Sequence, residues 1–506
     1  MNKTLKYISA GAILAMIASC DMDLVPKGSI SYNPGDQIIT NQSDLTAYRA
    51  NVLACFRSLD YGDFDIVSDV MADYFNAASD FGNNYGPVHR TDNTFTTGDY
   101  NTEDNWEYPY SYIKNFNIFI EGAKVVPAEL KAQADVARGE AFLARAFAYM
   151  HLARHFGKAY SPETASSDLC VPLVTVYDQS ERPARATVAQ VYGQIKSDLD
   201  SAAVLLAGVP GEVRSQYPTI DAVNFMYARY YLDTRDYQRA AEYATGVINT
   251  GTYALSSTAE EMTAEWLDDE GTEPVMQFYA SISEGQGGHS AYTGMAVTDG
   301  VTHYHPYFIP SQKLIDAYDE GDIRFAQWFD GGDYPSYHNA TWYNDDGTDY
   351  YVFKKYFGNP DLYSSAAPNS AQAVKPFLIS EMYLIAAEAY LEAGNAANAL
   401  TYLNALQEKR HATLSLTATE ENIHNEWYRE TVGEGLRFSC LKRWGEGFSG
   451  RPAQPGAEMV VNTGTAYTEK VFASDDYHFQ WPIPTYEMQT NLNLVQNEGY
   501  GATVVE

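Results

Sequence analysis

Aromatic side chains interleaved with amides and carboxylates form the part of this sequence best suited to chemistry. The densest example is residues 330–346, where Trp342, Tyr343 and Tyr337 stand among glycine, asparagine and aspartate. Flat aromatic rings pack against the C–H faces of sugars, and amides and carboxylates bind hydroxyls. We therefore predict a saccharide-binding surface loop with Trp342 and Tyr343 as main stacking residues and Tyr337 as a further contact. The alternative is that these rings only pin a long loop down.

A second aromatic segment, residues 80–86, has the same character and contains Asn84 and Tyr85. Elsewhere Tyr304 and His303 offer a ring and an imidazole to a ligand. A histidine also follows two residues after His303, but no cysteine or third histidine completes a metal-ligand set. We therefore predict that Asn84, Tyr85, Tyr304 and His303 contact the ligand and that no metal is bound.

No catalytic motif accompanies these aromatic residues. The G-x-S-x-G, P-loop and dinucleotide-binding patterns do not occur in a suitable context. A glycosidase needs two carboxylates roughly 5–10 Å apart, and nothing marks out such a pair among 66 acidic residues. Glu430, Glu434, Arg437 and Arg443 lie at helical spacings, which favours ion pairs along a helix. We predict a protein that is not an enzyme and has no cofactor.

The charge and the cysteines narrow the class of protein further. A formal net charge of −33 would repel phosphates, so the sequence argues against a nucleic-acid partner. Apart from Cys20 there are only Cys55, Cys170 and Cys440. A disulfide framework is therefore not what holds this fold, and we expect buried thiols or at most one bridge.

The first twenty residues have the layout of a bacterial secretion signal. Lys3 and Lys6 precede an apolar run over residues 8–18, and small residues follow before Cys20. The run is too short to span a bilayer, which takes roughly 20 residues. Its end resembles a lipoprotein box, which implies that residues 1–19 are removed and that Cys20 is diacylated. The protein then sits on a membrane through its lipid anchor.

Two kinds of segment alternate along the rest of the chain. Alanine-rich stretches with helical periodicity occur at about 112–155, 187–207, 219–250, 376–411 and 421–444. Between and after them lie loop-rich segments at about 74–105, 252–375 and 446–506. The alanine-rich stretches predict paired helices, and the loop-rich segments predict loops with a few short strands.

An internal repeat connects two of the helical stretches. The spacing Ala-x2-Tyr-x8-Ala-x2-Tyr starts at Ala228 and again at Ala387, with a turn in the middle of each copy. Small residues let two antiparallel helices approach closely while tyrosines fill the gaps, as in tetratricopeptide repeats. Such pairs bury their apolar faces by stacking. The predicted fold is mainly α, a tetratricopeptide-like helical superhelix (pairs at about 112–250 and 376–445) with loop-rich insertions and short strands packed on one face.

Six sequence blocks, in order, resemble the SusD/RagB-like outer-membrane nutrient-binding lipoprotein family. They lie at 138–157, 182–199, 222–229, 381–410, 430–445 and 481–500. The match covers nearly the whole chain, and the order of the blocks makes it specific. Residues 425–429 and Cys440 depart from the usual pattern. We expect these positions to belong to the helical scaffold and not to a ligand site.

The resemblance implies a single SusD-like body over residues 20–506 that binds glycans outside the cell. It implies capture of oligosaccharide or polysaccharide and delivery to a SusC-like TonB-dependent transporter of the outer membrane. Asp21 and Asp23, just after the lipidated Cys20, resemble the signal that exports such lipoproteins to the cell surface. Two alternatives stay open: a RagB-like protein that captures peptides, and a transporter adaptor without a ligand of its own.

Overall fold

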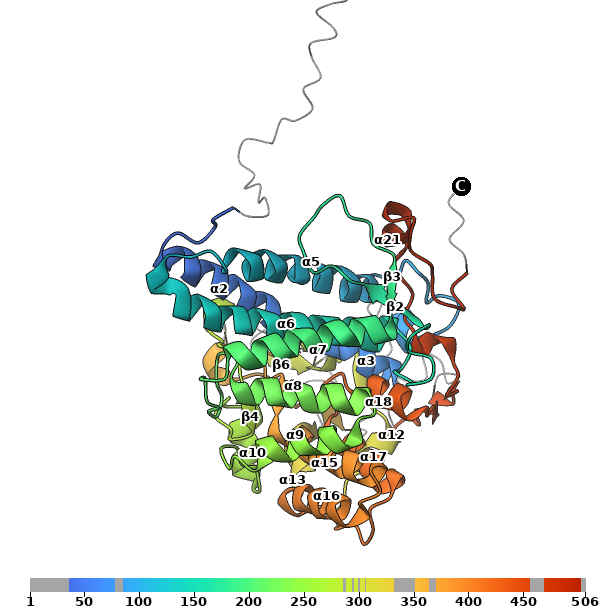
Figure 1. The fold of residues 1–506 in the computed structure, drawn as a ribbon. Coiled ribbons are helices and arrows are strands. Elements are labelled where there is room, and N and C mark those ends of the chain that lie inside the picture. Colours follow the sequence, from blue (N-terminus) through green and yellow to red (C-terminus); the bar gives the residue numbers. More distant parts are fainter. Residues whose placement is uncertain are drawn as a thin grey trace, which may run out of the picture.

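The computed structural model describes residues 36–77, 85–284, 288–293, 295–298, 301–304, 306–331, 351–363, 370–455 and 468–501. Long helices dominate this part of the chain and lie roughly side by side in a slab (Figure 1). They are α2 (Gln42–Arg57), α5 (Tyr100–Gly122), α6 (Lys131–Phe156), α7 (Val188–Leu205), α8 (Ile220–Asp233), α9 (Tyr237–Ile248), α15 (Ile379–Glu392), α16 (Ala396–Arg410), α17 (Glu420–Glu430) and α18 (Arg437–Trp444). The predicted helical-repeat fold is confirmed.

Local sequence signals set where several of these helices begin. Thr187 and Gln190 form a capping box at the start of α7, in which each side chain bonds the other residue's backbone N–H. Asp236 and Asn395 accept from backbone N–H groups at the starts of α9 and α16. These two caps sit in the turns that the repeat predicted.

The repeated alanines and tyrosines form the contacts that their spacing predicted. All four alanines of the two copies are fully buried, and α8 packs on α9 as α15 packs on α16. The rings of Tyr231 and Tyr243 stack with centroids 5.5 Å apart. Tyr390 and Tyr402 repeat this contact at 5.7 Å. Small residues therefore let the two helices of each pair approach closely, and a stacked pair of tyrosine rings packs between them.

The loop-rich segments build a second layer with its own core. Its short strands pair antiparallel: β1 (Phe75–Ala77) with β7 (Phe308–Pro310), and β8 (Phe329–Asp330) with β9 (Val352–Phe353). Other two-stranded pairs are β2 (Leu169–Pro172) with β3 (Arg185–Thr187), β4 (Pro274–Met276) with β10 (Phe377–Leu378), β5 (Met295–Thr298) with β6 (Val301–Tyr304), and β11 (Phe448–Ser449) with β12 (Val471–Phe472). A cluster around Phe75, Tyr292 and Phe353 forms the core of this layer, separate from the larger core of the slab.

Several helices in the described part of the chain were not predicted. α2 and α3 (Asp63–Met71) precede the first predicted helical stretch, and α5 begins at Tyr100, inside a segment predicted to be loop-rich. α2 buries only four of its sixteen residues, so its sequence carries little apolar periodicity. Further short helices lie in the loop-rich parts: α4 (Gly86–Arg90), α10 (Ala259–Trp266), α11 (Ser290–Thr293), α12 (Gln312–Ile315), α13 (Ile323–Trp328) and α21 (Thr485–Thr490).

The ion pairs predicted along one helix near the C-terminus were wrong. α17 ends at Glu430 and α18 begins at Arg437, and between them Gly433 and Gly435 take positive φ angles that interrupt the helix. The four charged side chains pair instead with other elements. The pairs are Arg437 with Asp73 at 2.8 Å, Arg443 with Glu388 at 2.9 Å, Glu434 with Lys355 at 2.6 Å, and Glu430 with Arg410 at 2.5 Å and Arg324 at 2.8 Å. The pairs with Asp73, Lys355 and Arg324 reach beyond the slab helices, whereas the pairs with Glu388 and Arg410 join helices of the slab to one another.

The cysteines are as expected for a fold without a disulfide framework. Among the described residues Cys55, Cys170 and Cys440 are free and buried. Burial raises the pKa of the Cys170 and Cys440 thiols to about 12, so neither is a ready nucleophile.

Candidate functional site

The two aromatic segments predicted to bind saccharide leave from neighbouring strands. β1 ends at Ala77, immediately before residues 78–84, while residues 332–350 lie between β8 and β9. β7 pairs with β1 and also contacts β9. The ring of Phe75 lies 5.3 Å from that of Phe353, so β1 and β9 share one core. The described ends of both segments are thus fixed to one small layer.

Most of the predicted ligand residues lie outside the described part of the chain. These are Trp342, Tyr343, Tyr337 and Asn84. Their contact with a ligand stays a prediction, and the elements on either side of their segments are described.

Tyr85 lies where the first segment rejoins the described chain. It takes a left-handed backbone conformation (φ 54°) just before α4. Its hydroxyl donates to Oδ1 of Asp63 at the start of α3, and its ring lies 6.0 Å from that of Phe308 on β7. Burial and the nearby Asp63 carboxylate raise the pKa of Tyr85. The hydroxyl is therefore engaged, and the partly exposed ring is the part that a ligand can reach.

His303 and Tyr304 belong to strand β6. In the β5–β6 hairpin His303 is opposite Ala296, and Tyr304 is opposite Met295. Among the described residues no group of three or more histidine, cysteine, aspartate or glutamate side chains is arranged to hold a metal.

Sequence reasoning missed a tyrosine stripe beside Tyr85. Tyr100 and Tyr108 on α5 are each 45 % exposed, and the ring of Tyr108 stacks on Tyr112 at 6.2 Å. Burial, with repulsion from nearby carboxylates, raises the pKa of Asp104 in this stripe to about 6. The signal is present in the sequence, because these residues recur every four positions, but only Tyr100 and Asp104 lie in the segment predicted to be loop-rich.

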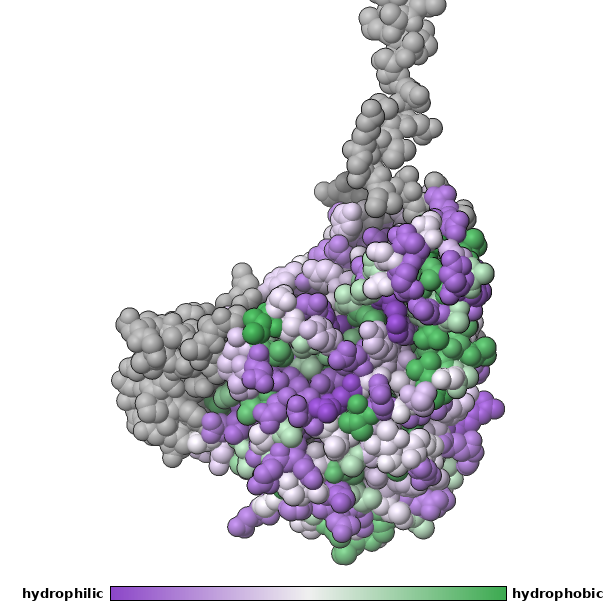
Figure 2. All heavy atoms as spheres, turned by 90° about the vertical axis from the view of Figure 1, so that its left-hand side faces the viewer, coloured by the Kyte–Doolittle hydropathy of each residue, from purple (hydrophilic) through white to green (hydrophobic). Residues whose placement is uncertain are grey.

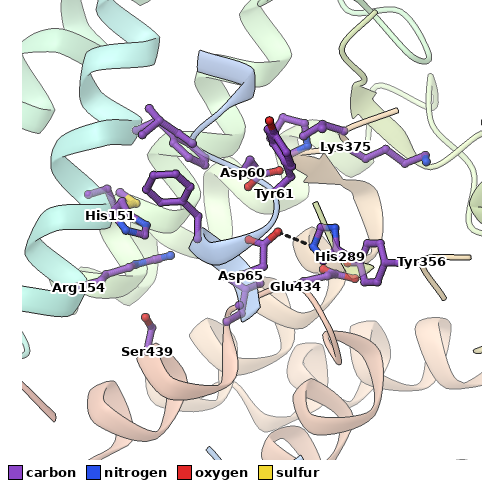
Figure 3. A pocket seen from close by; sticks show the side chains of 18 of the residues that line it. Asp60, Tyr61, Asp65, His151, Arg154, His289, Tyr356, Lys375, Glu434 and Ser439 are labelled. Atoms are coloured by element: carbon purple, nitrogen blue, oxygen red, sulfur yellow. Dashed lines mark hydrogen bonds and ion pairs between the residues drawn. The ribbon is translucent and has the colours of Figure 1, made fainter. Parts of the chain in front are cut away.

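A cavity of about 90 Å³ lies between the helical slab and the loop-bearing layer (Figure 3). Its lining includes Asp65 of α3, His289, Tyr356 and Glu434, and in this view His151 of α6 lies on the other side of Asp65 from His289. Pockets for small ligands usually measure about 300–1,000 Å³, so this space suits a few water molecules rather than a sugar.

The charges around this cavity favour neutral forms. Burial, followed by repulsion from Glu434, raises the pKa of Asp65 well above its usual value. Burial also lowers the pKa of His289 to about 3. The His289 Nε2 lies 3.1 Å from the Asp65 Oδ2, and its ring stacks on Tyr356 with centroids 3.8 Å apart. The cavity thus forms a polar seam that fastens the two layers together.

The architecture therefore defines a helical-repeat scaffold that carries a loop-bearing layer. No described helix is both long and apolar enough to cross a membrane. Family models match both halves of the chain: one described as starch-binding associating with outer membrane at residues 44–232, and one described as the SusD family at residues 250–500. The chain belongs to the SusD/RagB family.

Individual relatives agree with this assignment. The SusD-like protein P2 of Formosa agariphila is 25 % identical over 436 residues, which cover 81 % of this chain and 83 % of that protein. The starch-binding protein SusD of Bacteroides thetaiotaomicron is 32 % identical over 125 residues, 24 % of this chain and 21 % of that protein.

Solved structures share the fold. A SusD superfamily protein from Bacteroides thetaiotaomicron superposes with a TM-score of 0.74 at 25 % identity, covering 90 % of this chain and 99 % of that one. A surface glycan-binding protein A from Bacteroides fluxus superposes with a TM-score of 0.69 at 19 % identity, covering 91 % and 100 %. One matching family model and one relative are named as starch-binding, and this chain is not an enzyme.

Proposed function

We propose that this protein is a glycan-binding lipoprotein of the cell surface that captures oligosaccharide and delivers it to a SusC-like TonB-dependent transporter. The observation that carries the proposal is the attachment of both aromatic segments to adjacent strands. β1 and β9 belong to one packed layer, so residues 78–84 and 332–350 start from the same part of the molecule. Loops held by a rigid scaffold are common places for binding residues.

The ligand chemistry follows from the side chains on these segments. Trp342 and Tyr343 supply the main stacking faces, and Tyr337 and Asn84 supply further contacts. The exposed part of the Tyr85 ring lies at the edge of the same layer. A relative named as a starch-binding protein and a structural neighbour named as a surface glycan-binding protein support a glycan as cargo.

The membrane part of the proposal has separate support. One matching family model is described as associating with the outer membrane. Cys20 ends a signal-like segment and would carry the lipid. The whole chain has a formal net charge of −33, so anionic lipid headgroups repel it, and we assign its attachment to the lipid anchor and a protein partner.

Affinity electrophoresis of the purified protein in gels that contain plant or host polysaccharides tests the proposal. Retardation by at least one glycan is expected, and calorimetry with the matching oligosaccharide then gives the dissociation constant. A peptide mixture is the comparison arm. Binding of peptides alone would indicate a RagB-like cargo, and stable association with a barrel transporter without any ligand would indicate an adaptor.

A further inference from the structure

A second concave surface lies on the side of the molecule where β4 and the α7–α8 connection meet. Figure 2 looks onto this side and shows a hollowed surface that is largely hydrophilic at its centre. The groove measures about 560 Å³. Residues 212–217 and 277–280 form its two walls, and Asn359, Leu362 and Ala373 also line it. None of the residues predicted to bind ligand belongs to it.

Backbone hydrogen bonds hold the walls in place. The N–H of Arg214 donates to the carbonyl of Pro274 at 2.8 Å, and the N–H of Gln277 donates to that of Ser215 at 2.9 Å. The N–H of Phe278 donates to the carbonyl of Val374 at 2.9 Å. The groove is therefore part of the packed fold and exists before any ligand arrives.

Each wall presents one exposed tyrosine. Tyr217 is 43 % exposed and Tyr279 is 54 % exposed. The Arg49 guanidinium lies 4.1 Å from the centre of the Tyr217 ring, and Glu140 holds Arg49 through two hydrogen bonds of 2.8 and 2.5 Å. This contact covers one face of the Tyr217 ring and fixes its orientation, as a stacking platform requires.

One wall contains a side-chain acceptor without a partner among the described residues. The Gln277 side-chain nitrogen donates to the carbonyl of Asp269 at 2.9 Å, which orients the amide. Its oxygen is buried and has no hydrogen-bond partner among the described residues. A buried acceptor without a partner is unfavourable, so a bound donor such as a hydroxyl that reached this oxygen would satisfy it.

The groove carries almost no net charge despite the acidity of the chain. The Asp269 carboxylate accepts from Lys375 at 2.6 Å and from Asn359 at 3.0 Å. Glu212 and Arg214 add one charge of each sign. A groove of this kind does not select an ion. Two ring faces and an oriented acceptor fit an uncharged molecule with both C–H faces and hydroxyls.

We propose that the groove between Tyr217 and Tyr279 is a second saccharide-binding site, which takes a short uncharged oligosaccharide. Its ligand class rests on the proposed glycan-binding function, but it shares no residue with the segments around Trp342. A second contact point on the same body would let one glycan chain, or two neighbouring chains, bind with higher avidity than a single site.

The test compares two double variants by calorimetry and affinity electrophoresis, with the glycan that retards the wild-type protein. Y217A/Y279A is expected to weaken binding about fivefold to tenfold, because stacking contributes about 1 kcal/mol beyond buried area. W342A/Y343A removes the predicted loop site and is expected to keep a weaker binding step. Adding Y217A/Y279A to it is expected to abolish that step.

Controls separate loss of the site from loss of the fold. Y217F/Y279F keeps both rings and is expected to bind like the wild type. Tyr486→Ala removes a tyrosine that is 61 % exposed outside the groove and is expected to change nothing. Unchanged affinity and stoichiometry in Y217A/Y279A, with glycan binding intact, would overturn the second site alone. Absence of glycan binding in the wild type would overturn the proposed function itself.

Discussion

Arg229 on α8 and Glu381 on α15 form a buried, two-armed ion pair. The Arg229 Nε donates to Oε1 of Glu381 at 2.7 Å, and a terminal guanidinium nitrogen donates to Oε2 at 2.6 Å. Both side chains are less than a tenth exposed. The guanidinium also lies 4.9 Å from the centre of the Phe225 ring. Because the partners come from different repeat pairs, this contact joins the earlier helices of the slab to the later ones.

Arg229→Met is expected to lower the free energy of unfolding by about 3–5 kcal/mol, because it leaves the Glu381 carboxylate buried without its cation. Urea denaturation followed by circular dichroism measures the change. The double variant R229M/E381M removes both charges and is expected to recover much of the loss. If R229M lowers the free energy of unfolding by less than about 1 kcal/mol, the ion pair does not stabilise the contact between α8 and α15.

Two glycines of the sequence block 430–445 allow a matched comparison. Gly435 and Gly445 have nearly the same φ, 67° and 68°. A Cβ on Gly435 would lie 2.7 Å from the Cα of Asp65, whereas one on Gly445 meets open space. Gly445→Ala is expected to be destabilising by about 1 kcal/mol from backbone strain alone. Gly435→Ala should lower the free energy of unfolding by at least about 1 kcal/mol more than Gly445→Ala does, because the α3 backbone must move. Equal thermal midpoints for the two variants would contradict the close packing of Gly435 on α3.

The buried Asp65 makes stability depend on pH. Its folded-state pKa lies well above the ordinary aspartate pKa of about 3.9, so the unfolded chain releases this proton first as pH rises. The stabilising contribution of the protonated form is complete below about pH 4 and is lost as pH rises toward the folded-state pKa. Asp65→Asn removes the titration, so the variant is expected to gain stability relative to the wild type between pH 5 and 8. Each pH unit of the window corresponds to about 1.4 kcal/mol at most.

Urea midpoints at several pH values for the wild type, D65N and the exposed control Asp475→Asn provide the measurement. The control should follow the wild type. Parallel curves for D65N and the wild type would show that the seam between the layers tolerates a charged Asp65.

The helical half of the fold was predictable because its signals are local. The spacing from Ala228 to Tyr243 specifies which faces of two consecutive helices meet, and the structure confirms those contacts. The partners of the charged motif residues were not predictable, because they are distant in sequence. Arg437 reaches Asp73, near the start of the chain. The short spacing of the charged motif residues predicted partners within one helix. That helix is interrupted at Gly433 and Gly435, which have positive φ.

The candidate site was predictable in composition but not in geometry. Clusters of aromatics, amides and glycines are visible in sequence, and they named Trp342 and its neighbours. That residues 78–84 and 332–350 leave from one layer depends on the pairing of β1 with β7 and of β8 with β9. The groove was missed for the same reason, since Tyr217 and Tyr279 stand alone in sequence and only folding brings them to one groove.

Cys20→Ser is expected to abolish lipid attachment and to release the protein from the outer-membrane fraction. The thiol is the group that would be acylated, and the rest of the signal-like segment is left intact. Metabolic labelling with palmitate and partition into detergent measure the change. Persistent labelling would show that Cys20 is not the anchor and that the boundary between residues 1–19 and the body is misplaced.

Trp342→Ala is expected to weaken glycan binding severalfold without unfolding the protein. A large ring that stacks on a sugar acts as a hot spot, because it supplies much apolar contact for little loss of conformational entropy. The segment that carries Trp342 lies between β8 and β9, and the core of their layer is built from other rings such as Phe353 and Tyr292. The urea midpoint should therefore stay at the wild-type value while the dissociation constant rises. Trp342→Phe keeps a smaller stacking face and should bind with intermediate affinity. Calorimetry with the glycan found by electrophoresis decides the matter, and equal affinity of W342A and the wild type would remove Trp342 from the site.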